Sequence, residues 1–143
     1  MTVAIISVRE ASTRLPNKCF LNIAGRSIIK HVIERCQQGG LDPIVATTTE
    51  DAAIVGLCQL ARVKCFAGSS DDKLARWLGA CDQHSVESFV TVDCDDPLFD
   101  PRLSHAQFEE LRTCNIISPD TNAYLGSNGW AFKTEVLREI YAR

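Results

Sequence analysis

The sequence lacks both of the glycine-rich motifs that most often bind nucleotide phosphates. It has 8 glycines in 143 residues, and they form neither a Gly-x-x-x-x-Gly-Lys nor a Gly-x-Gly-x-x-Gly pattern. The first absence excludes a Walker-type phosphate loop, and the second excludes the glycine fingerprint that cradles dinucleotides. Any nucleotide site in this chain must therefore be built with other side chains.

Metal-binding and membrane-spanning patterns are also missing. The 7 cysteines are scattered singly, with no Cys-x-x-Cys pair, and only 3 histidines accompany them. This spacing argues against a zinc site. An odd number of thiols, without a basic-then-apolar leader, predicts a cytoplasmic protein with reduced and mostly buried cysteines. No apolar run approaches the roughly 20 residues needed to span a bilayer, so no membrane association is expected.

Charge of one sign is not concentrated anywhere in the chain as a block. The 15 Lys and Arg against 18 Asp and Glu give a formal net charge of −3. A surface that binds duplex nucleic acid usually carries a basic excess, so nucleic-acid binding is not expected. With 45% apolar and 23% charged residues, the composition is globular, and the length suits one domain over residues 1–143.

Strand and helix patterns alternate along the chain. Short apolar or β-branched runs predict strands at 3–7, 44–48, 63–66, 89–92, 115–118 and 130–132. Helical spacing of apolar residues predicts helices that begin near 28, 50, 69–72, 102 and 135, with Trp77 and Trp130 in the core. This alternation predicts an α/β fold: a three-layer sandwich with a mainly parallel sheet and helices on both faces.

The segment that follows the first strand concentrates positive charge. Arg9, Arg14 and Lys18 lie within 10 residues, beside the hydroxyls of Ser12 and Thr13. Guanidinium groups bind phosphate oxygens bidentately, a lysine ammonium acts as a movable point charge, and hydroxyls can fill the remaining positions. Solvated loop charges would explain any one of these cations. Together they favour a polyanion such as a nucleoside triphosphate.

An acidic segment follows the fourth strand. Asp93, Asp95, Asp96 and Asp100 lie within 8 residues. In a doubly wound sheet, this segment and the cationic loop share the carboxyl edge of the strands, where ligands bind. A carboxylate beside phosphates suits Mg²⁺, and Asp95 is the best candidate for holding it. Asp-Pro pairs also begin turns, and Asp100 is expected instead to cap the helix at Arg102.

These two segments together resemble the sugar cytidylyltransferases, the enzymes that make CMP-ulosonic acids such as CMP-Kdo and CMP-sialic acid. The loop reads Arg9, two residues, Ser-Thr-Arg-Leu-Pro, one residue, Lys18, and it is most similar to the spore-coat polysaccharide branch. Residues 94–101 resemble the family motif Gly-Asp-(Glu or Cys)-Pro-Leu-x-Asp-Pro. The resemblance implies a Rossmann-like nucleotide-diphospho-sugar transferase architecture, in which the loop wraps the triphosphate of CTP and Asp95 binds the metal.

The resemblance also implies individual roles for residues. Catalytic roles fall to Arg9, Arg14, Lys18 and Asp95. Contacts to the nucleotide are implied for the loop cations and for Val8, Ser12, Thr13, Thr47, Thr48 and Asp72. The two threonines stand at a strand end that passes near the base and ribose in the family, and Asp72 stands in an acidic helix opening. Both features also arise for purely structural reasons.

Several positions depart from the family pattern. Cys94 replaces a glycine, and Asn17 stands where glycine is usual, although asparagine tolerates left-handed backbone geometry. Asn128 occupies a position where the most similar branch tends to have an aspartate, and an amide is a poor metal ligand. The resemblance does not reach the C-terminal third of a family-length domain, which in many members includes an arm that builds a dimer. That third is therefore expected to be missing.

Two functions follow from this interpretation. The first is nucleotidyl transfer: CMP passes from CTP to the hydroxyl of a sugar acid with release of pyrophosphate, for cell-surface polysaccharide synthesis and with Mg²⁺ as cofactor. The second is a non-catalytic family member that binds a nucleotide or a protein partner. The fold alone cannot separate these, or a related enzyme with another base or sugar, because this architecture hosts many chemistries. A homodimer is also expected, because an uncovered sheet edge invites pairing.

Overall fold

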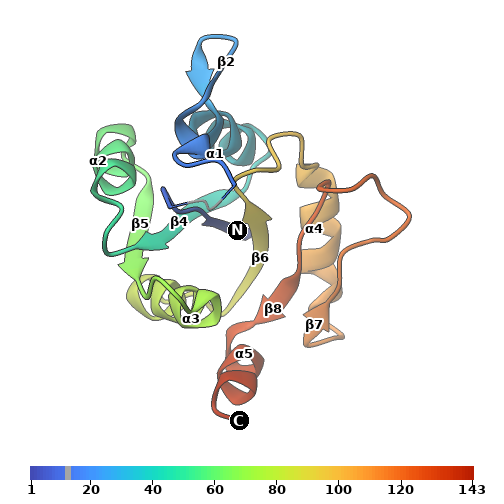
Figure 1. Cartoon of the computed structure of the whole chain (residues 1–143). Helices are drawn as coiled ribbons and strands as arrows, with labels where there is room; N and C mark the ends of the chain where they lie inside the picture. The colour runs from blue at the N-terminus through green and yellow to red at the C-terminus, as the bar shows by residue number, and fades with distance from the viewer. Residues whose placement is uncertain (12–13) are drawn as a thin grey trace.

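The computed structural model describes residues 1–11 and 14–143. Six strands form the main sheet in the order β5-β4-β1-β6-β8-β7. They are β1 (Val3–Ser7), β4 (Asp42–Thr48), β5 (Lys64–Gly68), β6 (Ser88–Asp93), β7 (Ile116–Ile117) and β8 (Ala131–Lys133). The helices are α1 (Ile28–Gln38), α2 (Ala52–Ala61), α3 (Lys73–His84), α4 (Pro101–Glu110) and α5 (Thr134–Tyr141), with a 3₁₀ turn η1 (Lys18–Phe20). Figure 1 shows the helices arranged around the sheet.

The sheet is parallel except at one end. β4 pairs with β1 and with β5, and β1 pairs with β6, all in parallel, whereas β8 runs antiparallel to both β6 and β7. The predicted α/β fold with a mainly parallel sheet is confirmed. Within this register, Ser7 at the end of β1 lies between Ala46 of β4 and Asp93 of β6. The carboxyl ends of these three strands therefore meet at one edge of the sheet.

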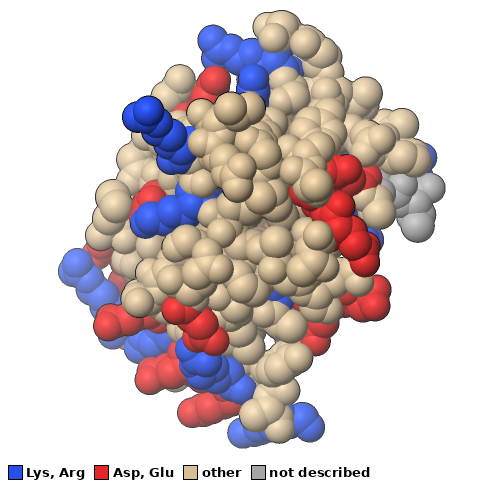
Figure 2. Space-filling view, turned by 90° about the vertical axis from the view of Figure 1, so that its left-hand side faces the viewer, with Lys and Arg blue, Asp and Glu red and all other residues tan. Residues whose placement is uncertain are grey.

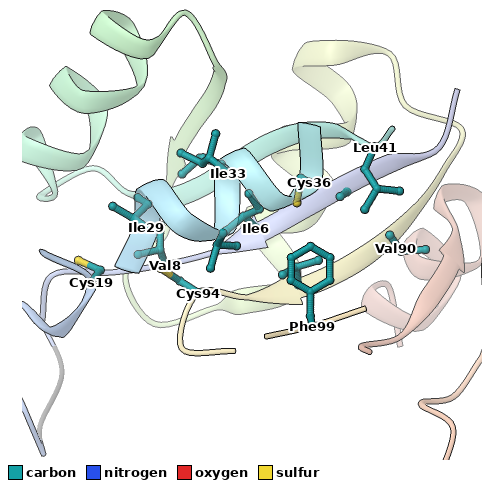
Figure 3. Close-up of a cluster of buried hydrophobic side chains, with 14 of the residues drawn as sticks. Ile6, Val8, Cys19, Ile29, Ile33, Cys36, Leu41, Val90, Cys94 and Phe99 are labelled. Carbon is teal, nitrogen blue, oxygen red and sulfur yellow. The ribbon is translucent and has the colours of Figure 1, made fainter. Parts of the chain in front are cut away.

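Successive residues of the inner strands feed two separate cores. Ile6 belongs to the core under α1, α2 and α4, whereas its neighbour Ile5 belongs to the core under α3 and α5. Figure 3 shows the first core, with Ile29, Ile33 and Cys36 of α1 lying over β1. Because both faces of the strand are covered, its sequence reads as a continuous apolar run instead of an alternating one.

Asp72, Asp100 and Ser27 occupy the cap positions of three helices. Asp72 caps α3 by accepting a hydrogen bond from the Ala75 N–H at 2.9 Å. Asp100 caps α4 by accepting one from the Arg102 N–H at 2.9 Å, which confirms its expected structural role. Ser27 occupies the cap position of α1, but its buried hydroxyl has no partner within the described part of the chain.

Two local features differ from the sequence prediction. A short hairpin of β2 (Asn22–Ile23) and β3 (Arg26–Ser27) precedes α1, and strands of 2 residues are too short to show any periodicity. Trp77 is buried as predicted, whereas the prediction for Trp130 is wrong: it is 44% exposed and stacks on Phe132 with ring centroids 6.0 Å apart. Trp130 immediately precedes β8, where the sheet nears its antiparallel end.

The distribution of thiols and charges follows the composition. Five cysteines are buried, Cys65 is half-buried and Cys114 is exposed, as expected for small core residues. On the face shown in Figure 2, Lys and Arg side chains lie beside Asp and Glu around a largely uncharged centre. Within residues 1–11 and 14–143, no helix combines the length and the apolar character that crossing a membrane requires.

Candidate functional site

A cavity of about 410 Å³ lies at the carboxyl edge of the sheet. Its walls come from four segments: the end of β1 with the loop that follows, the start of α1, the start of α3 with the residues before it, and the end of β6 with the loop that follows. Five of the predicted site residues line it, namely Val8, Arg9, Arg14, Lys18 and Asp95. The fold therefore brings the cationic loop and the acidic segment together across 77 residues of sequence, as Lys18 and Asp95 show.

Two further cations line the cavity that the sequence analysis did not single out. Lys73 and Arg76 both lie on α3, and they bring the number of lining cationic side chains to five. Lys73 Nζ pairs with Asp93 Oδ1 at 2.7 Å and lies 5.2 Å from the centre of the Trp77 ring. Arg76 directly precedes Trp77, and this place beside a core residue was the sequence signal that could have indicated its burial.

Arg76 is buried, and no carboxylate among the described residues pairs with it. It is 6% exposed, and its Nη1 donates to the carbonyls of Ser69 at 2.6 Å and Ser70 at 3.3 Å. Its Nε has no partner among the described residues. Burial lowers the pKa of Arg76, and the positive charge of Arg9 lowers it further. A buried cation beside a second cation is costly, and an anionic ligand would offset that cost.

An ion pair joins the cationic loop to the acidic segment. Lys18 Nζ lies 2.5 Å from Asp95 Oδ2, and this hydrogen bond holds the pKa of Asp95 below its ordinary value. Asp96 behaves differently: burial raises its pKa, and the charges of Asp95 and Asp93 raise it further. Asp95 therefore lines the cavity as an ionised carboxylate at neutral pH.

The segment that carries Asp95 is anchored at its far end. Phe99 is 1% exposed within the core under α1, and its carbonyl accepts a hydrogen bond from Arg35 Nε at 2.5 Å. One residue later, the Asp100 N–H donates to the Ser127 carbonyl at 2.6 Å. Gly126 packs so closely that a Cβ there would lie 2.5 Å from Asp96 Oδ1. These contacts hold the acidic segment against α1 and residues 126–127.

Thr47, Thr48 and Asp72, which were predicted to contact the nucleotide, are not among the residues that line the cavity. Thr47 and Thr48 are buried, and the Thr47 hydroxyl and the Thr48 N–H both donate to Asp51 Oδ2, at 2.6 and 3.0 Å. Asp72 accepts the capping hydrogen bond from the Ala75 N–H. All three residues therefore make structural contacts, which was the alternative that their sequence positions left open. The structure does not bring them to the other five.

The sequence analysis also singled out Ser12, Thr13 and Asn17 in the loop. The predicted contacts of Ser12 and Thr13 lie outside the described residues. Asn17 has a φ of 57°, the left-handed conformation for which asparagine is a tolerated substitute for glycine. The Ser127 hydroxyl donates to Asn128 Oδ1 at 3.2 Å. The Nδ2 of Asn128 is buried and has no partner in the part of the chain that the structure describes.

Two buried thiols line the cavity between the loops. Figure 3 shows Cys19 and Cys94 near Val8, at the start of α1. Burial raises the pKa of Cys19 to about 11, and it raises the pKa of Cys94 well above its ordinary value. Because the thiolate is the reactive form, neither cysteine is a nucleophile at neutral pH. The chemistry of the cavity therefore belongs to its cations and carboxylates.

The fold and the cavity define an α/β protein with a charged cavity at one edge of its sheet. Guanidinium, ammonium and carboxylate groups meet at the carboxyl edge of a parallel sheet, the position where such sheets bind nucleotides. Among residues 1–11 and 14–143, no group of three or more His, Cys, Asp or Glu side chains is placed to hold a metal. Mg²⁺ bound to phosphates requires only one or two protein carboxylates, so the presence of Asp95 alone still fits such an ion.

Comparison with known proteins identifies the family. The sequence profile of the cytidylyltransferase family matches residues 3–137, and the chain belongs to this family. It is 37% identical to a 3-deoxy-manno-octulosonate cytidylyltransferase of Acidovorax sp. strain JS42, over 84% of this chain and 47% of that protein. It is 34% identical to an uncharacterized protein of Methanocaldococcus jannaschii, over 97% of this chain and 59% of that protein. The chain thus spans about half the length of these curated relatives.

A solved structure gives the same fold. A cytidylyltransferase from Leptospira borgpetersenii superposes with a TM-score of 0.86, covering 99% of this chain and 63% of that one at 23% sequence identity. At this identity, the likeness concerns the fold alone. It agrees with the Rossmann-like nucleotidyltransferase architecture that the family resemblance implied.

Proposed function

We propose that this chain binds CTP in the cavity at the carboxyl edge of the sheet and transfers CMP to the hydroxyl of a sugar acid, releasing pyrophosphate. The observation that supports this is the grouping of five cationic side chains with the Asp95 carboxylate in one cavity of a cytidylyltransferase-family chain. Cations at this density suit the charge of a triphosphate and of the pyrophosphate that leaves.

The proposed reaction is an in-line displacement at the α-phosphorus. The acceptor hydroxyl oxygen forms a bond to the α-phosphorus as the bond from that phosphorus to the β-bridging oxygen breaks. Pyrophosphate leaves with the bonding electron pair, and the hydroxyl proton passes to solvent water. Arg9, Arg14 and Lys18 hold the triphosphate and stabilise the charge on the leaving group, so positioning and charge carry most of the catalysis.

Lys18 changes partner in this proposal. In the structure its ammonium pairs with Asp95 at 2.5 Å, and both side chains are partly exposed, at 32% and 53%. An exposed pair of this kind contributes only about 0–1 kcal/mol, so a phosphate can displace the carboxylate at little cost. The released carboxylate is then available for a cation.

Asp95 is the residue that we propose holds Mg²⁺. Its lowered pKa keeps it ionised at neutral pH, and Mg²⁺ prefers oxygen ligands and keeps several waters beside phosphates. When bound, the ion would neutralise charge that develops on the phosphates. Asp93, two residues before Asp95, lines the same cavity and supplies a second carboxylate, which pairs with Lys73 in the structure.

The acceptor class rests on the family resemblance and on the relatives. Several relatives carry the name 3-deoxy-manno-octulosonate cytidylyltransferase, and that name specifies a sugar acid as their acceptor. A sugar acid of this class, used for cell-surface polysaccharide, is therefore the acceptor that we propose for this chain. The second candidate, a non-catalytic member that binds a nucleotide or a protein partner, is favoured by Asn128 at the expected position of an aspartate.

Calorimetric titration tests the proposal directly. CTP, with ATP and GTP as controls, is titrated with and without Mg²⁺ into the wild type, Arg14→Ala and Asp95→Asn. We expect CTP-selective binding that Arg14→Ala weakens about 10-fold or more, and a metal dependence that Asp95→Asn abolishes. Arg112→Ala removes a cation that is exposed outside the cavity, and it should bind CTP like the wild type.

Two results would contradict the proposal. Absence of CTP binding at millimolar concentration would exclude the nucleotide site. Equal binding by Arg14→Ala and the wild type would exclude the loop from it. If CTP binds but no sugar acid leads to pyrophosphate release in a coupled phosphatase assay, the non-catalytic function is the better explanation.

A further inference from the structure

Glu10 and Asp51 fasten the cationic loop to the start of α2. The Glu10 N–H donates to Asp51 Oδ1 at 3.0 Å, and Asp51 is only 3% exposed. In return, Glu10 Oε1 accepts hydrogen bonds from the N–H groups of Ala53 at 3.1 Å and Ile54 at 3.3 Å. These bonds join two segments that are more than 40 residues apart in the chain.

Glu10 also closes the loop on itself. Its carbonyl accepts a hydrogen bond from the Asn17 N–H at 3.0 Å. Arg9 directly precedes Glu10, and Lys18 directly follows Asn17, so the two cations flank this closing bond. All three polar groups of Glu10, its N–H, its carbonyl and its carboxylate, are therefore used to fix the base of the loop.

The carboxylate of Asp51 also fixes the base of the loop. Beyond the Glu10 N–H, it accepts hydrogen bonds from Thr47 and Thr48 at the end of β4. Although partial burial acts against it, these hydrogen bonds hold the pKa of Asp51 below its ordinary value. Within the described residues, neither Glu10 nor Asp51 forms an ion pair with a loop cation. The two acids therefore fix the backbone and leave the guanidinium groups available to a ligand.

We propose that Glu10 and Asp51 are positioning residues, which hold the cationic loop in the conformation that binds the triphosphate. This inference rests on the proposed nucleotide-binding function and adds residues to it that do not line the cavity. It also assigns a role to Thr47 and Thr48: they act at the nucleotide through Asp51 and the loop. The physical basis is preorganisation, because a loop that is ordered before binding loses less entropy when the ligand arrives.

The sign of the effect separates positioning from simple electrostatics. Glu10 is an acid close to a site for a polyanion, so electrostatics alone predicts tighter CTP binding when its charge is removed. Positioning predicts the opposite for Glu10→Ala, which loses the acceptor for Ala53 and Ile54. Glu10→Gln keeps an oxygen that accepts these bonds, and it should therefore retain wild-type affinity.

The test combines calorimetry of CTP with Mg²⁺ and thermal melting of the same variants. We expect Glu10→Ala and Asp51→Asn to weaken CTP binding about 10-fold, the effect of one lost charge-assisted hydrogen bond. Asp51→Asn replaces one carboxylate oxygen with an amide NH₂ group, which cannot accept the hydrogen bonds that Asp51 receives in the wild type. The control is Thr134→Val, which removes the buried hydrogen bond from Thr134 to the Val86 carbonyl at 2.6 Å, outside the cavity. It should lower the melting temperature and leave CTP affinity unchanged.

The outcomes distinguish this inference from the proposed function. Tighter binding by both Glu10→Ala and Glu10→Gln, or wild-type binding by Glu10→Ala, would overturn the positioning role while Arg14→Ala still shows the nucleotide site. A loss of affinity in Thr134→Val equal to that in Glu10→Ala would also overturn it, because the effect would then follow stability. Absence of CTP binding by the wild type would overturn both proposals.

Discussion

Phe99 should couple the stability of the protein to its ligand affinity. Its ring is 1% exposed, and it ends the segment that carries Asp95. An aromatic ring of this kind buries about 150–250 Å², which at about 25 cal/mol per Å² corresponds to roughly 4–6 kcal/mol as an upper estimate. Measured Phe→Ala substitutions in cores cost about 3–5 kcal/mol, which agrees with the lower part of that range.

Phe89 provides a matched control for Phe99→Ala. It is 0% exposed in the other core, between Trp77 and Phe132 at centroid distances of 6.2 and 5.7 Å. Both variants should lower the free energy of unfolding by about 3–5 kcal/mol in urea denaturation. Only Phe99→Ala should also weaken the Mg²⁺-dependent binding of CTP, because it alone frees the segment that carries Asp95. Equal affinities in the two variants, or a loss of unfolding free energy below about 1 kcal/mol, would refute this reasoning.

Three further predictions concern charge, metal and assembly. Replacing Lys18 by Gln should raise the pKa of Asp95 in a carbon-13 carboxyl titration, because its largest cause of lowering is removed. Because the folded-state pKa of Asp95 is lowered, its ion pair stabilises the protein above the pKa of the unfolded state, and this stabilisation is lost as the pH falls through the folded-state pKa. For this half-exposed pair, Lys18→Gln should change the free energy of unfolding by less than about 1 kcal/mol. Asn128→Asp should strengthen the Mg²⁺ dependence of CTP binding in calorimetry, and an unchanged dependence would exclude position 128 from the metal site. Light scattering should give the mass of a dimer, and a monomer mass would contradict that prediction.

The strands were predictable from sequence where they are buried on both faces. β1 has the bounds that its apolar run predicts, because neighbours on both sides and helices above and below leave room only for such residues. β4 begins two residues before its predicted start at Ile44, because Pro43 is accommodated in register opposite Ala4. The hairpin of β2 and β3 has no such constraint, since its residues are largely exposed.

The site was predictable where charge and position agree. The loop cations and Asp95 follow strands that end at one edge, so the order of elements is enough to bring them together. Arg76 escaped because it lies within a helix whose neighbours are core residues, and its burial depends on tertiary packing. Thr47 and Thr48 bond locally to Asp51, but the bond between Asp51 and Glu10 joins a distant loop and could not be read from their own segment.

The distribution of thiols gives the protein an internal chemical reporter. Cys19 and Cys94, at 2% and 4% exposure, line the same cavity as the loop cations, whereas Cys114 is open to solvent. Alkylation should therefore be fast at Cys114 and slow at the buried cavity pair. Mass spectrometry of peptides labelled over time would then record how often that pair becomes accessible to solvent, without an introduced probe.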